Sequence, residues 1–135
     1  MADAGVGIVL VSHSADVAES VAAMAVALAG GGFERIAAAG GTSDGGFGTD
    51  AERIAAAARE VDGGAGVAVL ADLGSAVLTV VALLADEDEE LPADTRLVDA
   101  PFVEGAVAAV VTASAGADLA AVLAAAGDAY DYRKA

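Results

Sequence analysis

The sequence predicts one α/β domain over residues 1–135, a three-layer, doubly wound fold with a mainly parallel sheet of about four to five strands and helices on both faces. Three observations predict it. Strand-like and helix-like segments alternate along the chain, an order typical of parallel strands covered by helices. The clearest strand-like segments are uninterrupted apolar runs, as expected of strands buried on both faces. The length suits one domain with its own core.

The first predicted strand and helix lie near the N-terminus. The strand is the β-branched run "VGIVLVS" at 6–12, and the helix covers 15–30, where apolar residues recur at helical spacing. Asp16 with Glu19 matches a capping box at the start of this helix. A triple glycine is expected to end it.

The middle of the chain is rich in alanine and glycine. The segment "RIAAAG" at 35–40 is a weaker second strand, and the glycine-rich loop "GGTSDGGFGTD" follows it at 40–50. Thr49 with Glu52 matches a second capping box, so we expect a second helix from there to near Gly63.

The remaining elements continue the alternation. The polar tail at 128–135 is expected to fray or to pack as a short edge segment. The elements before it are a third buried strand over 66–72, a third helix over 74–86, a fourth strand over 95–100, a helix beginning at Pro101, and a last helix capped by Asp118 and stopped by Gly127.

Composition limits the function classes. With 21 acidic and 6 basic residues the net charge is −15, which disfavours nucleic acid as a partner because phosphate contacts need Lys and Arg. The chain has no cysteine and one histidine, so we expect no disulfide and no metal site. The uncharged stretch between Glu19 and Glu34 is too short to span a membrane, and no basic leader precedes it. We therefore expect a soluble cytoplasmic protein without membrane contact.

The acidic residues are spread along the chain, apart from the run "DEDEE" at 86–90, which is most simply a solvated loop. The chain has a single lysine, Lys134, and its apolar residues are mostly small. This combination is typical of proteins that stay soluble in high salt, where the Debye length is only ~3 Å at 1 M. The sequence thus predicts a halophilic protein that loses structure when salt is removed.

Candidate chemistry collects after the strands. His13, the loop 40–50, "DLGSA" at 72–76 and "DAPF" at 99–102 each follow one predicted strand. Because the carboxyl ends of parallel strands share one edge of the sheet, these four segments should meet there, where such folds bind their ligands.

His13 is the main candidate residue. A neutral imidazole is a good nucleophile near pH 7 and can take up a phosphoryl group. Asp72 is the obvious carboxylate to fix its tautomer and to stabilise a cationic adduct. Position alone leaves a second interpretation open, in which His13 is only a solvated turn residue.

Backbone amides and hydroxyl groups near the same edge could hold the phosphoryl oxygens. The other motifs of phosphate and hydrolase chemistry are absent: no phosphate loop ends in Gly-Lys-Ser/Thr, no dinucleotide fingerprint follows the first strand, no receiver-type acidic pair occurs there, and no Gly-x-Ser-x-Gly elbow is present. The residues whose amides or hydroxyl groups could form such a phosphoryl-binding cradle are Ser12, Ser14, Gly48, Thr49, Gly74 and Ser75.

Four stretches together carry a family resemblance: "IVLVSHSADVAESV", "GGFGTD", "VLADLGSAVL" and "VDAPFVEGAVAAVV". From about residue 6 to residue 125 the chain resembles the phosphotransferase subunits of dihydroxyacetone kinase, the DhaM family. Their phosphocarrier domain is related to the mannose-class enzyme IIA domains of the bacterial phosphotransferase system. The resemblance implies that His13 is transiently phosphorylated and that Asp72 is the aspartate in contact with it.

The resemblance also implies partners. HPr would supply the phosphoryl group, which originates in phosphoenolpyruvate. The acceptor would be ADP, held with magnesium on the DhaL subunit, while DhaK binds dihydroxyacetone. This chain would bind no cofactor directly and would form a homodimer. Its strong acidity departs from the family and implies partners with similarly adapted surfaces.

Two alternatives remain. A mannose-class enzyme IIA that phosphorylates a sugar transporter would share the fold and the histidine, although "DLGSA" favours the kinase subunit. A non-catalytic binding module of doubly wound fold would leave His13 inert.

Overall fold

Four parallel strands form one sheet in the structure, a computed structural model that describes residues 5–88 and 91–135. Residues 1–4 and the last two residues of the acidic run 86–90 lie outside the described residues. The strand order is β2-β1-β3-β4, so β1 and β3 are central. The strands are β1 (Gly7–Ser12), β2 (Ile36–Gly40), β3 (Val67–Ala71) and β4 (Thr95–Leu97).

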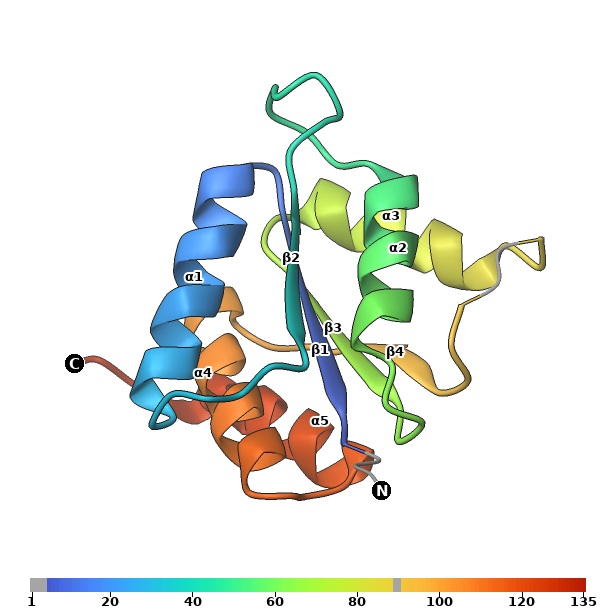
Figure 1. The fold of residues 1–135 in the computed structure, drawn as a ribbon. Coiled ribbons are helices and arrows are strands. Elements are labelled where there is room, and N and C mark those ends of the chain that lie inside the picture. The colour runs from blue at the N-terminus through green and yellow to red at the C-terminus, as the bar shows by residue number, and fades with distance from the viewer. Residues whose placement is uncertain (1–4, 89–90) are drawn as a thin grey trace.

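Helices connect the strands and cover both faces of the sheet. They are α1 (Ala15–Leu28), α2 (Ala51–Val61), α3 (Gly74–Ala85), α4 (Phe102–Ser114) and α5 (Leu119–Gly127), followed by one 3-10 turn, η1 (Asp128–Asp131). Helices α1, α4 and α5 lie on one face, and α2 and α3 lie on the other (Figure 1). The predicted three-layer, doubly wound α/β fold is confirmed.

The central strands divide the core in two because successive side chains of a strand point to opposite faces. Ile8 and Leu10 of β1 belong to the core under α1, α4 and α5, whereas Val9 and Val11 belong to the core under α2 and α3. All four are fully buried. This burial on both faces explains why β1 reads as a continuous apolar run rather than an alternating one.

Both predicted capping boxes are wrong in detail. Ser14 caps α1, since its hydroxyl accepts a hydrogen bond from the Val17 N–H over 3.3 Å. Asp50 caps α2 by accepting from the Glu52 N–H over 3.0 Å. In both cases a short polar side chain at the position just before the first helical residue binds the free amide. Each cap therefore lies within two residues of the predicted one.

The C-terminal part differs from prediction in two places. The fourth strand ends at Leu97 instead of continuing to residue 100, because the chain leaves the sheet edge before Pro101, the N-cap of α4. The tail begins with the 3-10 turn η1, whose Ala129 is buried, instead of an edge segment. The Asp118 cap of α5 is confirmed by a 3.0 Å hydrogen bond from the Ala121 N–H.

The carboxyl ends of all four strands point to the edge of the sheet where α1, α2 and α3 begin (Figure 1). The four predicted segments follow these ends. No helix in the described part of the chain is both long enough and apolar enough to cross a bilayer.

Candidate active site

His13 is the first residue after β1, at the carboxyl edge of the sheet. Its side chain is 24% exposed, so the ring is sheltered yet within reach of solvent. Ser14 caps α1, and the turn therefore joins the strand directly to the helix. Gly40, at the end of β2, lies against this turn, where a Cβ atom would collide with the Ser14 carbonyl. The close approach of β2 thus requires glycine and holds the histidine turn in place.

Asp72, the first residue after β3, binds His13 through both carboxylate oxygens. Oδ1 accepts a hydrogen bond from Nδ1 of the His13 ring over 2.9 Å, and Oδ2 accepts one from the His13 backbone N–H over 3.1 Å. The Ser12 hydroxyl donates to Oδ2 over 2.8 Å, and the Leu73 N–H donates to Oδ1 over 2.6 Å. Four donors therefore converge on one carboxylate.

These contacts set the acidity of Asp72. Partial burial disfavours the charged carboxylate, but the hydrogen bonds from Ser12, His13 and the Leu73 N–H outweigh it and hold the pKa of Asp72 below its ordinary value. An ionised carboxylate only accepts hydrogen bonds, so the shared proton belongs to Nδ1 of the ring. In a neutral ring the lone pair then lies on Nε2.

Ser75 covers this second ring nitrogen. Its hydroxyl lies 2.5 Å from Nε2, and because Nε2 is the acceptor in this tautomer, the hydroxyl is the donor. Ser75 and Gly74 form the start of α3, which has no side-chain cap. The amides of a helix N-terminus attract anions, so a hydroxyl and a positive helix end both lie beside Nε2.

The glycine-rich loop after β2 closes another side of the site. The Gly48 N–H donates to the His13 carbonyl over 2.9 Å, and Gly48 has a φ of +145°. Thr79 donates its hydroxyl to the Ser75 carbonyl over 3.0 Å, so the 2.9 Å contact between the Thr49 and Thr79 hydroxyls is donated by Thr49. The loop is thereby joined to both the histidine turn and the start of α3.

The predicted site residues lie at one edge, but their polar groups have different partners. The Ser75 hydroxyl stands beside Nε2, and Gly74 precedes it as the first residue of α3. The Ser12 side chain is buried and donates to Asp72, and its oxygen accepts from the Ser14 N–H over 3.1 Å. The Ser14 hydroxyl caps α1, the Gly48 N–H binds the His13 carbonyl, and the Thr49 hydroxyl binds Thr79. Phosphoryl binding by these four residues stays a prediction.

Two contributors to the site were not predicted from the sequence. The Leu73 backbone N–H supports the Asp72 carboxylate, and Thr79 links the loop to α3. A signal existed for the second, because Thr79 stands four residues after Ser75, the spacing at which a hydroxyl binds the preceding helical carbonyl. No side-chain pattern could reveal the first, since it is a backbone contact.

The predicted segment 99–102, which follows β4, lies beside the site. Its first residues and those that follow β3 line one small hollow of about 240 Å³. Asp72, Gly74, Asp99 and Tyr130 are among the residues that line it. The Tyr130 hydroxyl donates to Asp99 over 2.9 Å and so attaches the C-terminal turn to the residues that follow β4. Within 5–88 and 91–135, no group of three or more histidine, cysteine, aspartate or glutamate side chains is placed to hold a metal ion.

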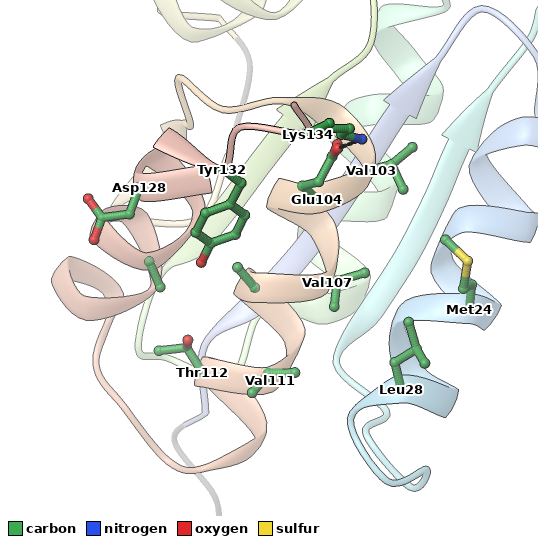
Figure 2. A pocket seen from close by; sticks show the side chains of 12 residues that line it. Met24, Leu28, Val103, Glu104, Val107, Val111, Thr112, Asp128, Tyr132 and Lys134 are labelled. Carbon is green, nitrogen blue, oxygen red and sulfur yellow. Dashed lines mark ion pairs between the residues drawn. The ribbon is translucent and has the colours of Figure 1, made fainter. Parts of the chain in front are cut away.

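A larger groove of about 660 Å³ lies elsewhere, along α4, with α1 on one side and the end of the chain from α5 onward on the other (Figure 2). Apolar side chains such as Met24 and Leu28 line much of it. Its charged lining is Asp128 together with the ion pair between Glu104 and Lys134. No residue bonded to the His13 ring lines this groove, which is thus separate from the candidate site.

Sequence comparisons agree on one family. The family model described as PTS system fructose IIA component matches residues 7–123. The phosphoryl donor subunit DhaM of PEP-dependent dihydroxyacetone kinase 2 from Listeria innocua is 37% identical over 106 residues, 78% of this chain and 84% of the relative. DhaM subunits from Pantoea ananatis and Escherichia coli K12 are 38% and 36% identical over 87% and 84% of this chain. These matches cover only 25% of each of those two longer proteins.

Solved structures show the same fold. The crystal structure of a protein of unknown function, EF1359, has a TM-score of 0.75 at 37% identity and covers 92% of this chain and 94% of its own. A sigma-54 interaction domain protein from Enterococcus faecalis has a TM-score of 0.66 at 17% identity, over 96% of this chain and 93% of its own, a likeness of fold alone. The chain belongs to the mannose-class enzyme IIA family, and within it resembles the DhaM phosphoryl donor subunits of dihydroxyacetone kinase.

Proposed function

We propose that the chain is the histidine phosphocarrier of a phosphoenolpyruvate-dependent dihydroxyacetone kinase, with His13 as the phosphoryl acceptor. One observation carries the proposal: Asp72 holds Nδ1 of the ring, which directs the lone pair of Nε2 toward the start of α3. The relatives that are named phosphoryl donor subunits support the kinase over other phosphate chemistry.

In the first step, HPr delivers the phosphoryl group from a phosphohistidine of its own. The Nε2 lone pair of His13 forms a bond to phosphorus as the N–P bond of the donor breaks, and the electron pair of that bond returns to the donor's ring nitrogen. His13 keeps its Nδ1 proton and becomes a cationic adduct. The Asp72 carboxylate stabilises this charge, since it is held ionised by its hydrogen bonds.

The Ser75 hydroxyl must release Nε2 before phosphorus can approach. We assign it, with the amides at the start of α3, to the equatorial phosphoryl oxygens, whose negative charge the helix N-terminus favours. Position supports this assignment, because the Ser75 hydroxyl lies beside Nε2 and Gly74 is the first residue of the same helix.

In the second step the phosphoryl group passes to ADP, held with magnesium on DhaL. A terminal phosphate oxygen of ADP forms the new O–P bond, the N–P bond to His13 breaks, and its electron pair returns to Nε2. The neutral ring with its Nδ1 proton is restored, so the chain turns over as a phosphotransferase component. ATP formed on DhaL then serves dihydroxyacetone bound to DhaK. No cofactor binds this chain in the proposal.

The test is reconstitution with labelled phosphoenolpyruvate, enzyme I and HPr. We expect one acid-labile phosphate on the wild-type chain and none on His13→Ala, with an unchanged circular dichroism spectrum for the variant. Stable phosphorylation of His13→Ala would remove the assignment, and an unlabelled wild-type chain would favour a non-catalytic binding module. Adding DhaL, DhaK and dihydroxyacetone should then discharge the label.

The description of the matching family favours a second candidate, an enzyme IIA that serves a sugar transporter. It shares the first step and differs in the acceptor. A labelled chain that is not discharged by DhaL, but is discharged by the transporter's sugar-phosphorylating subunit, would select it.

A homodimer is also part of the proposal, through the groove along α4. A second copy of a chain with a charge of −15 must meet the first where carboxylates are few. The groove offers such a place, because two of its three charged residues form an ion pair and exposed apolar side chains such as Leu28 flank it. Leu28→Asp should therefore shift the mass in sedimentation equilibrium from dimer to monomer, and an unchanged dimer would place the interface elsewhere.

A further inference from the structure

Three large apolar side chains are exposed around His13. Phe47 is 87% exposed, Leu73 is 62% exposed and Leu78 is 69% exposed. Phe47 and Leu73 are each next in sequence to a residue that binds His13, namely Gly48 and Asp72. We call Phe47, Leu73 and Leu78 the apolar rim.

Leu78 belongs to the rim through α3. It stands three residues after Ser75, so both side chains lie on the same side of the helix. Leu78 also lines a hollow together with Ala51 and Glu52 at the start of α2. The rim therefore extends from the glycine-rich loop to the side of α3 that faces the start of α2.

The loop holds Phe47 in a defined place. Within it, the Thr42 hydroxyl binds the Asp44 carboxylate, and both side chains accept from the Gly46 N–H over 3.0 Å. On the other side of Phe47, the Gly48 N–H binds the His13 carbonyl. A side chain displayed by a bonded loop loses less entropy on binding than one on a free loop, so the arrangement suits an anchor for another protein.

The charge around the rim specifies the kind of partner. Asp16, Asp44 and Glu52 are exposed carboxylates on the same edge of the sheet. Arg53, the basic residue in the first turn of α2, pairs with Asp50 over 4.0 Å. A complementary surface would be apolar at its centre and basic at its margin.

We propose that the apolar rim is the docking surface for the carrier protein that phosphorylates His13, with Phe47 as its anchor. The inference rests on the proposed function. A phosphohistidine is part of its protein's own surface, so its phosphorus can come within about 3–3.5 Å of Nε2 only when the two surfaces meet. Because the rim stands on the segments bonded to His13, the donor must cover it. The occupant is thus a protein with a basic margin around its phosphohistidine.

The experiment compares two phosphoryl donors on the same variants: phosphorylated HPr, which must dock, and phosphoramidate, which is too small to need a docking surface. With HPr we expect Phe47→Ala to raise KM by about tenfold or more, as truncation of an aromatic anchor does, and Leu78→Ala to raise it less. With phosphoramidate the rate at which His13 is labelled should not change. Leu84→Ala is the matched control, a leucine on the same helix six residues beyond Leu78, and should behave as wild type with both donors.

Each outcome decides a different point. A wild-type chain that HPr does not label would overturn the proposed function itself. Normal HPr kinetics for both rim variants, with wild-type labelling intact, would overturn only the docking surface. The same result combined with slower discharge to DhaL would also overturn it, because the rim would then belong to the acceptor. An equal loss with both donors would show damage to the site instead of docking.

Discussion

At the scale of single residues, one carboxylate organises the site. Asp72 receives four hydrogen bonds, from Ser12, His13 and Leu73. Because Ser12 and His13 lie at the end of β1, these bonds link that end to the end of β3. Removing its charge should therefore affect reactivity more than shape.

Asp72→Asn provides the test. The amide of asparagine donates hydrogen bonds, so it favours the tautomer with the proton on Nε2 and removes the nucleophilic lone pair. We expect phosphorylation by HPr to slow by about two to four orders of magnitude, the scale seen when a supporting carboxylate of a histidine is neutralised. Rapid-quench kinetics would measure it. Asp99→Asn, a change two residues after β4 on the same edge, should leave the rate near wild type; an equal loss there would deny Asp72 its special role.

The lowered pKa of Asp72 also predicts how stability depends on pH. A carboxyl whose pKa is lower in the folded state stabilises the fold fully above its unfolded pKa, near 3.9. That stabilisation is lost as the pH falls through the lowered folded value. The difference in unfolding free energy between wild type and Asp72→Asn should thus be constant from pH 7 to about 5 and shrink below about 4. Urea titrations would show it, and a difference that grows in acid would contradict the shift.

The sequence predicted the pairing of His13 with Asp72 because both follow buried strands, and parallel strands end at one edge. It could not predict which hydroxyls remain available. Ser12 and Thr49 lie at the same edge, yet their protons are used in bonds to Asp72 and Thr79. Such pairings depend on distances of about an ångström, which strand order does not determine.

At the scale of elements, glycine decides how closely the first two strand ends approach. The helix caps show how far a local sequence pattern can predict structure. Ser14 and Asp50 cap α1 and α2, although Asp16 and Thr49 are the residues that match the capping-box motif. Ser14, Asp16, Thr49 and Asp50 are all residue types that can cap a helix, and the tertiary position of the first helical turn decides which of them does so.

Gly40→Ala should disturb the site from a distance. The added methyl would collide with the Ser14 carbonyl at the start of α1, and overpacking of this kind costs about 1–3 kcal/mol. We expect a lower melting temperature together with slower labelling of His13, because the histidine turn must shift. Gly127→Ala is the control: its φ is −64° and the new Cβ would lie 3.4 Å from the Asp99 carbonyl, an ordinary contact. Equal effects of both variants would show that space at Gly40 is not the cause.

At the scale of the whole molecule, charge is the dominant property. With 6 basic residues for 21 acidic ones, most carboxylates have no cation to pair with. The core that resists this repulsion contains mainly valine and alanine, and Ile8, Leu10, Ile54 and Leu70 are its largest fully buried side chains. Sequence composition predicted both features directly, since neither depends on which residues touch.

We therefore propose that stability depends on salt. At 0.1 M salt the Debye length is ~10 Å, so neighbouring carboxylates repel one another, whereas at 1 M it is ~3 Å and most repulsion is screened. The melting temperature should rise by about 10 °C or more between these conditions, since a few kcal/mol shift it by that much in a chain of this size. Sucrose at matched osmolality should reproduce only a small part of the rise, because it does not screen charge.

A variant with fewer charges separates screening from other effects of salt. Asp86, Glu87 and Asp88 form an exposed acidic stretch after α3. Changing them to Asn, Gln and Asn lowers the net negative charge by three without touching the core or the His13 site, so the triple variant should melt higher than wild type at 0.1 M salt and converge with it at 1 M. Identical melting curves for wild type in low and high salt would exclude a halophilic protein. A triple variant that keeps the full salt dependence would place the repulsion elsewhere on the surface.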